Sequence, residues 1–338
     1  MSFRHRLHRL LPICLFAMVG LLPLAACGGA GGAEGASGSS GSLKNVSIGL
    51  GYVPDIQFAP FYVAQSKGYY KAAGLNVTFH HGVVPDLIGS LVAGRSDFVF
   101  AGGDELLEAH DKTHVKAVDV ATIFQKYPVS VIVPANSSIH TLADLKGHTV
   151  GVPGPYGSTY TGFLALLYSA HLTLQDVHVK YINFTQVPAL LNHQADAVVG
   201  YSNNEPLQIA KRGMQVRTFA VSDYQPLVSN GIITTDANYQ KEPQVVRSFV
   251  QATLRGLRDA INDPSGAIDA SKNIPGLIDT SQTMSELQAT IPVWKGNGNL
   301  GYNDAATWTA TEKFLAAQKM IAPVSAANLG QMYTNKDI

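Results

Sequence analysis

The hydrophobic pattern begins with one apolar run and then changes to alternating strands and helices. Residues 1–27 read MSFRHRLHRLLPICLFAMVGLLPLAAC, with three arginines before an apolar run from Leu10 to Leu24. Basic residues ahead of an apolar run too short to span a membrane are typical of an export signal. Residues 28–43 are mostly Gly, Ala and Ser without apolar periodicity, which predicts a flexible linker.

From residue 44 onward, short apolar stretches alternate with helical periodicity. The predicted strands cover residues 46–50, 75–79, 97–101 and 118–124, and the predicted helices cover 60–73, 86–93 and 104–111. Gly74 and Gly94 follow two of these helices, where glycine commonly ends a helix. This alternation predicts an α/β fold with a mostly parallel sheet and helices on both faces.

A second unit of the same kind begins near Pro134. A short capped helix at 141–147, a strand at 149–152, a helix running from a glycine-rich turn at 154–158 to Ala170, and strands at 177–182 and 195–200 are expected. Residues 228–234 are expected to return as a strand toward the first unit. Further helices are predicted over 243–262, 265–273, 284–294 and 304–320.

Two such units predict a two-lobed clamp of two doubly wound sheets, joined by extended crossings at 125–133 and 224–234. We assign residues 44–128 and 229–338 to lobe 1 and residues 129–228 to lobe 2. Ligands of open parallel sheets bind outside the carboxyl ends of the strands. The cleft is therefore expected where the strand-end loops of both lobes meet.

Cysteine usage and charge exclude several function classes. Cys14 and Cys27 are the only cysteines, so residues 44–338 can form no disulfide and hold no thiol nucleophile or cysteine metal site. Loss of the three arginines in the export signal leaves 21 basic residues against 24 acidic ones, a net charge near −3. Without a basic stripe, no binding of nucleic acid is expected.

The end of the apolar run, Leu24-Ala25-Ala26-Cys27, resembles the lipobox of bacterial lipoproteins. The resemblance implies that residues 1–26 are removed, that Cys27 carries a lipid, and that residues 27–43 tether the body. It implies an exported protein, anchored to the outer face of the cytoplasmic membrane or in the periplasm. The alternative is an ordinary export signal with a chance cysteine.

Polar and aromatic side chains gather at the predicted strand ends and crossings, where a ligand would bind. The candidate ligand-binding residues are Asp55, Gln57, Phe58, Asp104, Gln125, Tyr127, Tyr156, Ser158, Thr159, Tyr201, Asn204 and Glu205. Asp55 and Asp104 have a simpler alternative as helix N-caps, and Phe58 has one as a core residue.

The chemistry of these turns favours a flat, hydrogen-bonding ligand. Residues 154–159 offer backbone N–H groups and hydroxyls at a helix start, which suits an anion or a carbonyl oxygen. A carboxylate at Glu205 accepts hydrogen bonds from an amine or ring N–H and repels a purely anionic ligand. Aromatic rings nearby, Tyr52 and Tyr224 among them, can stack on a heterocycle. The alternative role for Glu205 is a solvated helix cap.

Four segments carry a resemblance to a known family: residues 49–76, 142–153, 154–161 and 200–207, the last reading GYSNNEPL. They resemble the substrate-binding proteins of ABC importers, in particular the SsuA/THI-like family. The resemblance implies a type II-like periplasmic-binding-protein fold that captures a small molecule by hinge closure. It implies an ABC permease and its ATPase as partners, a monomer, and no cofactor.

The resemblance covers several ligand classes. A thiamine pyrimidine precursor is the first expectation, riboflavin the second, and a sulfonate or nitrate-type anion the third, because Glu205 and the aromatic loops suit an anion poorly. The enzymatic alternative is a thiamine-pyrimidine synthase, whose cysteine-rich signature is missing here. His110 and His114 lie four residues apart without a His-Glu-x-x-His pattern, so no metal site is expected. We therefore expect no catalysis.

Overall fold

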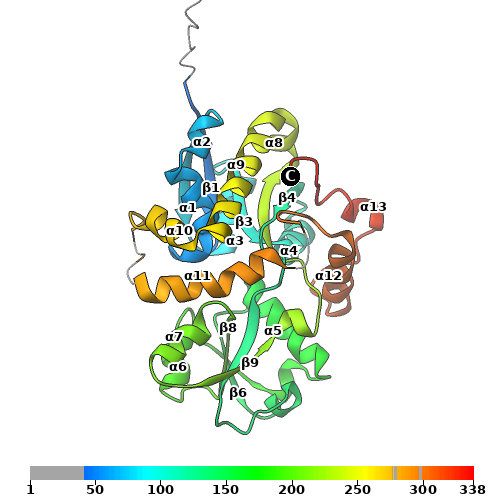
Figure 1. Ribbon diagram of the computed structural model, residues 1–338. Helices are drawn as coiled ribbons and strands as arrows, with labels where there is room; N and C mark the ends of the chain where they lie inside the picture. Colours follow the sequence, from blue (N-terminus) through cyan, green and yellow to red (C-terminus); the bar gives the residue numbers. More distant parts are fainter. Residues whose placement is uncertain (1–41, 276, 278–279, 297–298) are drawn as a thin grey trace, which may run out of the picture. The chain divides into compact units, whose positions relative to one another are not determined.

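The computed structural model describes residues 42–275, 277, 280–296 and 299–338 (Figure 1). The predicted export signal and the predicted lipid-bearing Cys27 lie outside these residues. The described part contains ten strands in two five-stranded sheets, which confirms the α/β class.

The first sheet has the strand order β2-β1-β3-β10-β4. Its strands are β1 (Lys44–Leu50), β2 (Leu75–His81), β3 (Phe98–Gly102), β4 (Ala117–Thr122) and β10 (Asn230–Thr235). Strand β1 is parallel to both β2 and β3, whereas β10 is antiparallel to β3 and β4. The returning strand expected at 228–234 thus lies inside this sheet and runs against its neighbours.

The second sheet has the order β7-β6-β8-β5-β9. Its strands are β5 (Val129–Pro134), β6 (Thr149–Val152), β7 (His178–Tyr181), β8 (Ala197–Tyr201) and β9 (Val216–Ala220). Strand β5, expected as part of a crossing, is antiparallel to β8 and β9. Its apolar side chains are buried, so the segment gains more as a central strand than as an extended linker.

Thirteen α-helices surround the sheets in the described part of the chain. They are α1 (Ala59–Ser66), α2 (Tyr69–Ala72), α3 (Val84–Val92), α4 (Gly103–Thr113), α5 (Gly157–Ser169), α6 (Gln186–Leu191), α7 (Glu205–Lys211), α8 (Asp236–Lys241), α9 (Pro243–Asn262), α10 (Pro264–Ser271), α11 (Thr280–Lys295), α12 (Ala305–Ala317) and α13 (Ala326–Leu329). The single helix expected at 60–73 is two helices, because Gly68 adopts a left-handed φ of 71° between them. No helix of the described residues has both the length and the apolar character to cross a membrane.

Helix α9 is the central support of the first sheet. The ring of Phe249 on α9 stacks on Phe98 of β3 with centroids 4.3 Å apart. Helix α9 also packs closely along α1, and this contact requires the small residue Gly256. The helix α11 contacts both the short 3-10 helix η1 (Ile56–Phe58), which follows β1, and α7, which follows β8 (Figure 1).

Candidate functional site

A cavity of about 650 Å³, counted with the open solvent at its mouth, lies at the carboxyl ends of strands from both sheets. Segments that follow β1, β2 and β3 contribute Gly51, Tyr52, Gln57, Val83, Val84, Pro85 and Glu105. The end of β8 and segments that follow β6, β7 and β8 contribute Pro153, Tyr156, Gly157, Ser158, Thr159, Phe184, Gln186, Tyr201, Asn204 and Glu205. This is the position expected for a ligand of two facing α/β units.

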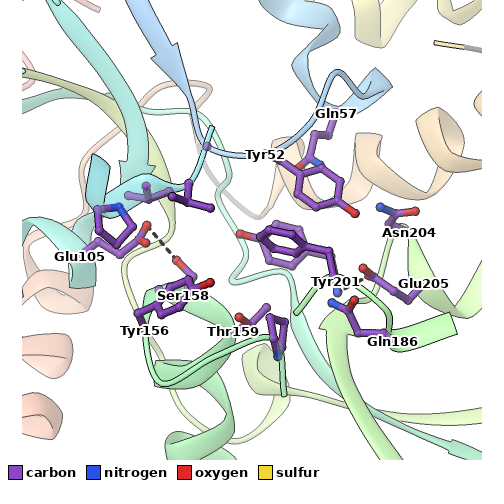
Figure 2. Close-up of a pocket in the computed structure, with 17 residues that line it drawn as sticks. Tyr52, Gln57, Glu105, Tyr156, Ser158, Thr159, Gln186, Tyr201, Asn204 and Glu205 are labelled. Carbon is purple, nitrogen blue, oxygen red and sulfur yellow. Dashed lines mark hydrogen bonds between the residues drawn. The ribbon is translucent and has the colours of Figure 1, made fainter. Parts of the chain in front are cut away.

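Seven of the twelve candidate residues line this cavity. They are Gln57, Tyr156, Ser158, Thr159, Tyr201, Asn204 and Glu205 (Figure 2). The structure does not place Asp55, Phe58, Asp104, Gln125 or Tyr127 in its lining. Figure 2 shows Tyr52 and Gln57 on one side and Tyr201, Gln186 and Glu205 on the other.

Two of the candidates outside the lining belong to the start of the helix after β1. The Asp55 carboxylate accepts a hydrogen bond from the Gln57 N–H at 2.9 Å and thereby caps η1. The Phe58 side chain is fully buried and meets Phe100 edge-on, with centroids 5.9 Å apart. Both residues therefore fit the simpler alternatives, although the capped segment holds Gln57 at the cavity.

At the start of α4, the structure places Glu105 rather than Asp104 at the cavity. Asp104 is fully buried, and its Oδ2 accepts a hydrogen bond from the Tyr127 hydroxyl at 2.7 Å. The same hydroxyl lies 2.9 Å from the carbonyl oxygen of Ser158, so Tyr127 links α4 to the start of α5. Gln125 instead donates to the Tyr302 carbonyl oxygen at 3.1 Å, outside the cavity.

The Glu105 carboxylate joins the starts of α4 and α5. Its Oε2 accepts hydrogen bonds from the Gly102 N–H at 2.8 Å and from the Ser158 hydroxyl at 3.3 Å (Figure 2). Burial, together with the neighbouring Asp104 carboxyl, raises the pKa of Glu105 well above its usual range. A direct polar contact between the two sheet-and-helix units therefore lies at the edge of the cavity.

Glu205 is the first residue of α7 and faces the cavity. Its Oε2 accepts a hydrogen bond from the Tyr201 N–H at 2.7 Å. Burial, with the carboxyl groups of Asp55 and Glu286, raises the pKa of Glu205 to about 7. The side chain is thus bonded to the local backbone, as a cap would be, and also lines the cavity.

Three residues that were not predicted as site residues also line the cavity: Glu105, Phe184 and Gln186. All three follow a strand, as do the candidates that line the cavity. Residues that follow the strands of such sheets are expected to face the cleft. Applied to the residues after β7 and to Glu105 as well as Asp104 after β3, this rule would have predicted all three.

The lining combines aromatic rings, hydroxyls, amides and two carboxyls. None of the described lining residues is Lys, Arg or His. Within the described part of the chain, no three His, Cys, Asp or Glu side chains gather where they could hold a metal ion. The arrangement can enclose a flat ring and exchange hydrogen bonds with its edge.

Comparison with known proteins gives a family model and several relatives. The model described as NMT1/THI5 like matches residues 55–267. The chain is 34% identical over 307 residues to the riboflavin-binding protein RibY of Chloroflexus aurantiacus, covering 87% of this chain and 86% of that protein. It is 26% identical over 293 residues to the formylaminopyrimidine-binding protein of Halalkalibacterium halodurans, covering 82% and 86%.

The fold is shared with solved binding proteins. The alkanesulfonate-binding protein SsuA of Xanthomonas axonopodis pv. citri superposes with a TM-score of 0.69 at 16% identity, covering 88% of this chain and 100% of that one. At this identity the likeness shows the fold alone. It confirms the periplasmic-binding-protein architecture expected from the sequence.

Proposed function

We propose that this chain, which belongs to the NMT1/THI5-like family, is the solute-binding component of an ABC importer and captures a small aromatic heterocycle. The observation that carries the proposal is the cavity at the strand ends of both sheets, lined by Tyr52, Tyr201 and Glu205, with no basic side chain among the described residues of its lining. Such a lining suits a flat ring with N–H or O–H donors. The partner that receives the ligand would be an ABC permease with its ATPase.

One observation favours riboflavin as the ligand, ahead of the pyrimidine precursor that the sequence alone favoured. The relative named for riboflavin matches at higher identity, 34% against 26% for the one named for formylaminopyrimidine. A thiamine pyrimidine precursor is the second candidate, supported by the second relative.

Titration of the purified protein with both compounds tests this proposal. We expect riboflavin fluorescence to be quenched on binding, because its ring would lie against tyrosine rings. Calorimetry with 4-amino-5-hydroxymethyl-2-methylpyrimidine tests the second candidate, and an alkanesulfonate and nitrate serve as anionic competitors. Binding of an anion with no binding of either heterocycle would overturn the proposal.

The two lobes predicted from the sequence provide the mechanism of ligand capture in this proposal. We propose that residues 44–128 with 229–338 move as one lobe, and residues 129–228 as the other, when a ligand is captured. The strands of the two sheets divide along these boundaries. The chain would act as a monomer and would bind its ligand without chemical change, so mass spectrometry should recover the ligand intact after incubation.

The anchor predicted at Cys27 remains part of the proposal. A lipid there would hold the protein at the outer face of the cytoplasmic membrane, and the Gly/Ser-rich linker would give the lobes freedom to reach the permease. Substitution of Cys27→Ser should release the protein from membranes and leave its unfolding midpoint unchanged. A variant that still sediments with membranes would contradict this anchor.

A further inference from the structure

The cavity carries two carboxyl groups and no counter-charge. Glu105 and Glu205 line it from the two opposite sheets, and their side chains are only 7% and 5% exposed. Additional carboxyl groups stand behind each one: Asp104 next to Glu105, and Asp55 and Glu286 near Glu205. No described lining residue is basic, so nothing in the lining offers a positive charge to a ligand.

The start of α5 would be the natural place for an anion, because free N–H groups at a helix N-terminus attract negative charge. The Glu105 carboxyl of the protein itself lies beside this place. The Ser158 hydroxyl donates to Glu105 Oε2 at 3.3 Å. A Cβ built on Gly157 would stand 3.2 Å from Glu105 Oε1, which shows how closely that carboxyl approaches the helix start.

The opposite wall of the cavity also carries a carboxyl group that is bonded to the protein backbone. Glu205 Oε2 accepts the Tyr201 N–H at 2.7 Å, the donor closest to the end of β8. A Cβ built on Gly200 would stand 2.7 Å from the same oxygen, so the carboxyl is held tightly against the strand end. A ligand phosphate at either wall would have to displace a carboxyl group or lie beside it.

We propose that this pocket selects an uncharged ring compound against its phosphate ester, and that Glu105 and Glu205 determine that selection. The inference rests on the proposed function and specifies its ligand class as unphosphorylated. A phosphate monoester carries a charge of about −1.5 to −2 at neutral pH. It would lose its hydration on entering the cavity, lie beside two carboxyl groups that become negatively charged as the pH rises through about 7 and above, and gain no cation from the described lining residues.

Matched calorimetric titrations with riboflavin and riboflavin 5′-phosphate test this selection. We expect the ester to bind about a hundredfold more weakly at about pH 9, where both carboxyls are ionised. Affinities within about threefold of each other would overturn the inference and leave the proposed function standing. If only the pyrimidine binds, the same comparison is made with 4-amino-5-hydroxymethyl-2-methylpyrimidine and its phosphate. If neither parent heterocycle binds, the proposed function itself fails.

Glutamine variants test whether the carboxyls of Glu105 and Glu205 cause the selection. Glu105→Gln and Glu205→Gln keep the size and an acceptor oxygen of the side chain but remove its negative charge, and the readout in each variant is the ratio of the ester's affinity to that of the parent compound. Each should strengthen binding of the ester by about tenfold. Glu312→Gln is the matched control, because Glu312 is also buried but lies on α12, outside the lining, where it accepts the Val324 N–H at 2.8 Å. Unchanged ester affinity in both cavity variants would overturn the assignment.

The pH dependence of the affinity ratio between the parent compound and its phosphate ester gives an independent test of the selection. Burial raises the pKa of Glu205 to about 7 and also raises that of Glu105, so both carboxyls lose protons as the pH rises through this range. The groups that face Glu105 are Asp104, Glu108 and Tyr201, and those that face Glu205 are Asp55, Glu286 and Tyr52. All six of these groups are acids, and Lys211 is a basic group that acts on one of them, Glu286, and lowers its pKa.

Because the ester's second pKa is about 6, its charge is nearly constant from about pH 7 to about pH 9. The preference for the parent compound should therefore grow over this range in the wild type and grow less in the double glutamine variant. A preference that shrinks with rising pH in the wild type would contradict the inference.

Discussion

The rings of Phe184 and Tyr52 meet edge-on at the cavity, with centroids 5.4 Å apart and planes inclined at 82°. Tyr52 follows β1 of the first sheet, whereas Phe184 follows β7 of the second. Phe184 is still 46% exposed, so it packs against Tyr52 on one side and faces solvent on the other. The pair therefore joins the segments that follow β1 and β7 across the cavity, and under the proposed hinge motion an opening of the lobes would break it.

We expect Phe184→Ala to speed ligand release. An edge-to-face pair contributes about 0.5–1.5 kcal/mol beyond burial, which corresponds to roughly a twofold to tenfold faster dissociation if the contact forms only on closure. Stopped-flow fluorescence of riboflavin release measures this rate. Tyr302→Ala is the control, because Tyr302 is also exposed but does not line the cavity. Equal release rates for both variants and the wild type would show that the pair does not hold the cavity closed.

Ligand binding should reduce the radius of gyration measured by small-angle scattering. The two sheets are connected by two chain crossings, one between β4 and β5 and one between β9 and β10, and we propose that these crossings act as the hinge. The contacts Ser158–Glu105 and Asn203–Thr290 would form on closure, since the latter ties the start of α7 to α11 at 2.8 Å. Identical scattering curves without ligand and at saturating riboflavin would argue against hinge closure.

The sequence correctly predicted elements whose hydrophobic pattern lies within one continuous segment of the chain. Strand β6 and helix α9 occupy the expected residues 149–152 and 243–262, because each has a continuous apolar pattern between clear boundaries. Strand β9 was not predicted. It reads VRTFA and lies at the edge of its sheet, where one neighbouring strand and partial burial leave little apolar signal.

The sequence identified the turns that form the site, but it did not always identify which residue of a turn lines the cavity. Asp104 and Glu105 are adjacent at the start of α4, and sequence alone cannot tell which one faces the cavity. The choice depends on how α4 is rotated, which Gly103 sets by its close packing against Val228 and Trp308. Contacts of this kind join residues far apart in the chain, so no local pattern reveals them.

Gly256→Ala should strongly destabilise the protein. A Cβ at this position on α9 would stand 2.1 Å from the Pro60 carbonyl oxygen of α1, so the two helices would have to move apart. Such overpacking typically costs about 1–3 kcal/mol, occasionally more. Gly89→Ala is the matched control within α3, where nothing lies within 4 Å of the new Cβ.

In the control, the gain in helix propensity should stabilise the protein by about 0.5–1 kcal/mol. Urea unfolding of the two variants measures both effects. A Gly256→Ala protein as stable as the wild type would show that α1 and α9 are not closely packed in solution.

Asp119 should make the protein less stable as the pH rises from about 4 to about 7. It is fully buried in β4, where its Oδ1 accepts the Ala121 N–H at 2.9 Å and its Oδ2 has no hydrogen-bond partner among the described residues. Burial raises the pKa of Asp119 to about 7, against about 3.9 for an unperturbed aspartate. In this pH range the folded state holds a proton that the unfolded state has released.

Since the folded state binds more protons, the free energy of unfolding falls with rising pH, by up to about 1.4 kcal/mol per pH unit for this group. The stabilisation is fully present below about pH 4 and is lost as the pH rises through about 7.

Buried Asp104, Glu105 and Glu205 act in the same direction, so the wild type should unfold at a lower urea concentration at pH 8 than at pH 5. Asp119→Asn cannot ionise and should show a smaller difference between the two pH values, whereas Asp223→Asn, at an exposed position, should keep the wild-type difference. Equal pH dependence in all three proteins would show that Asp119 is ionised in the folded state at neutral pH.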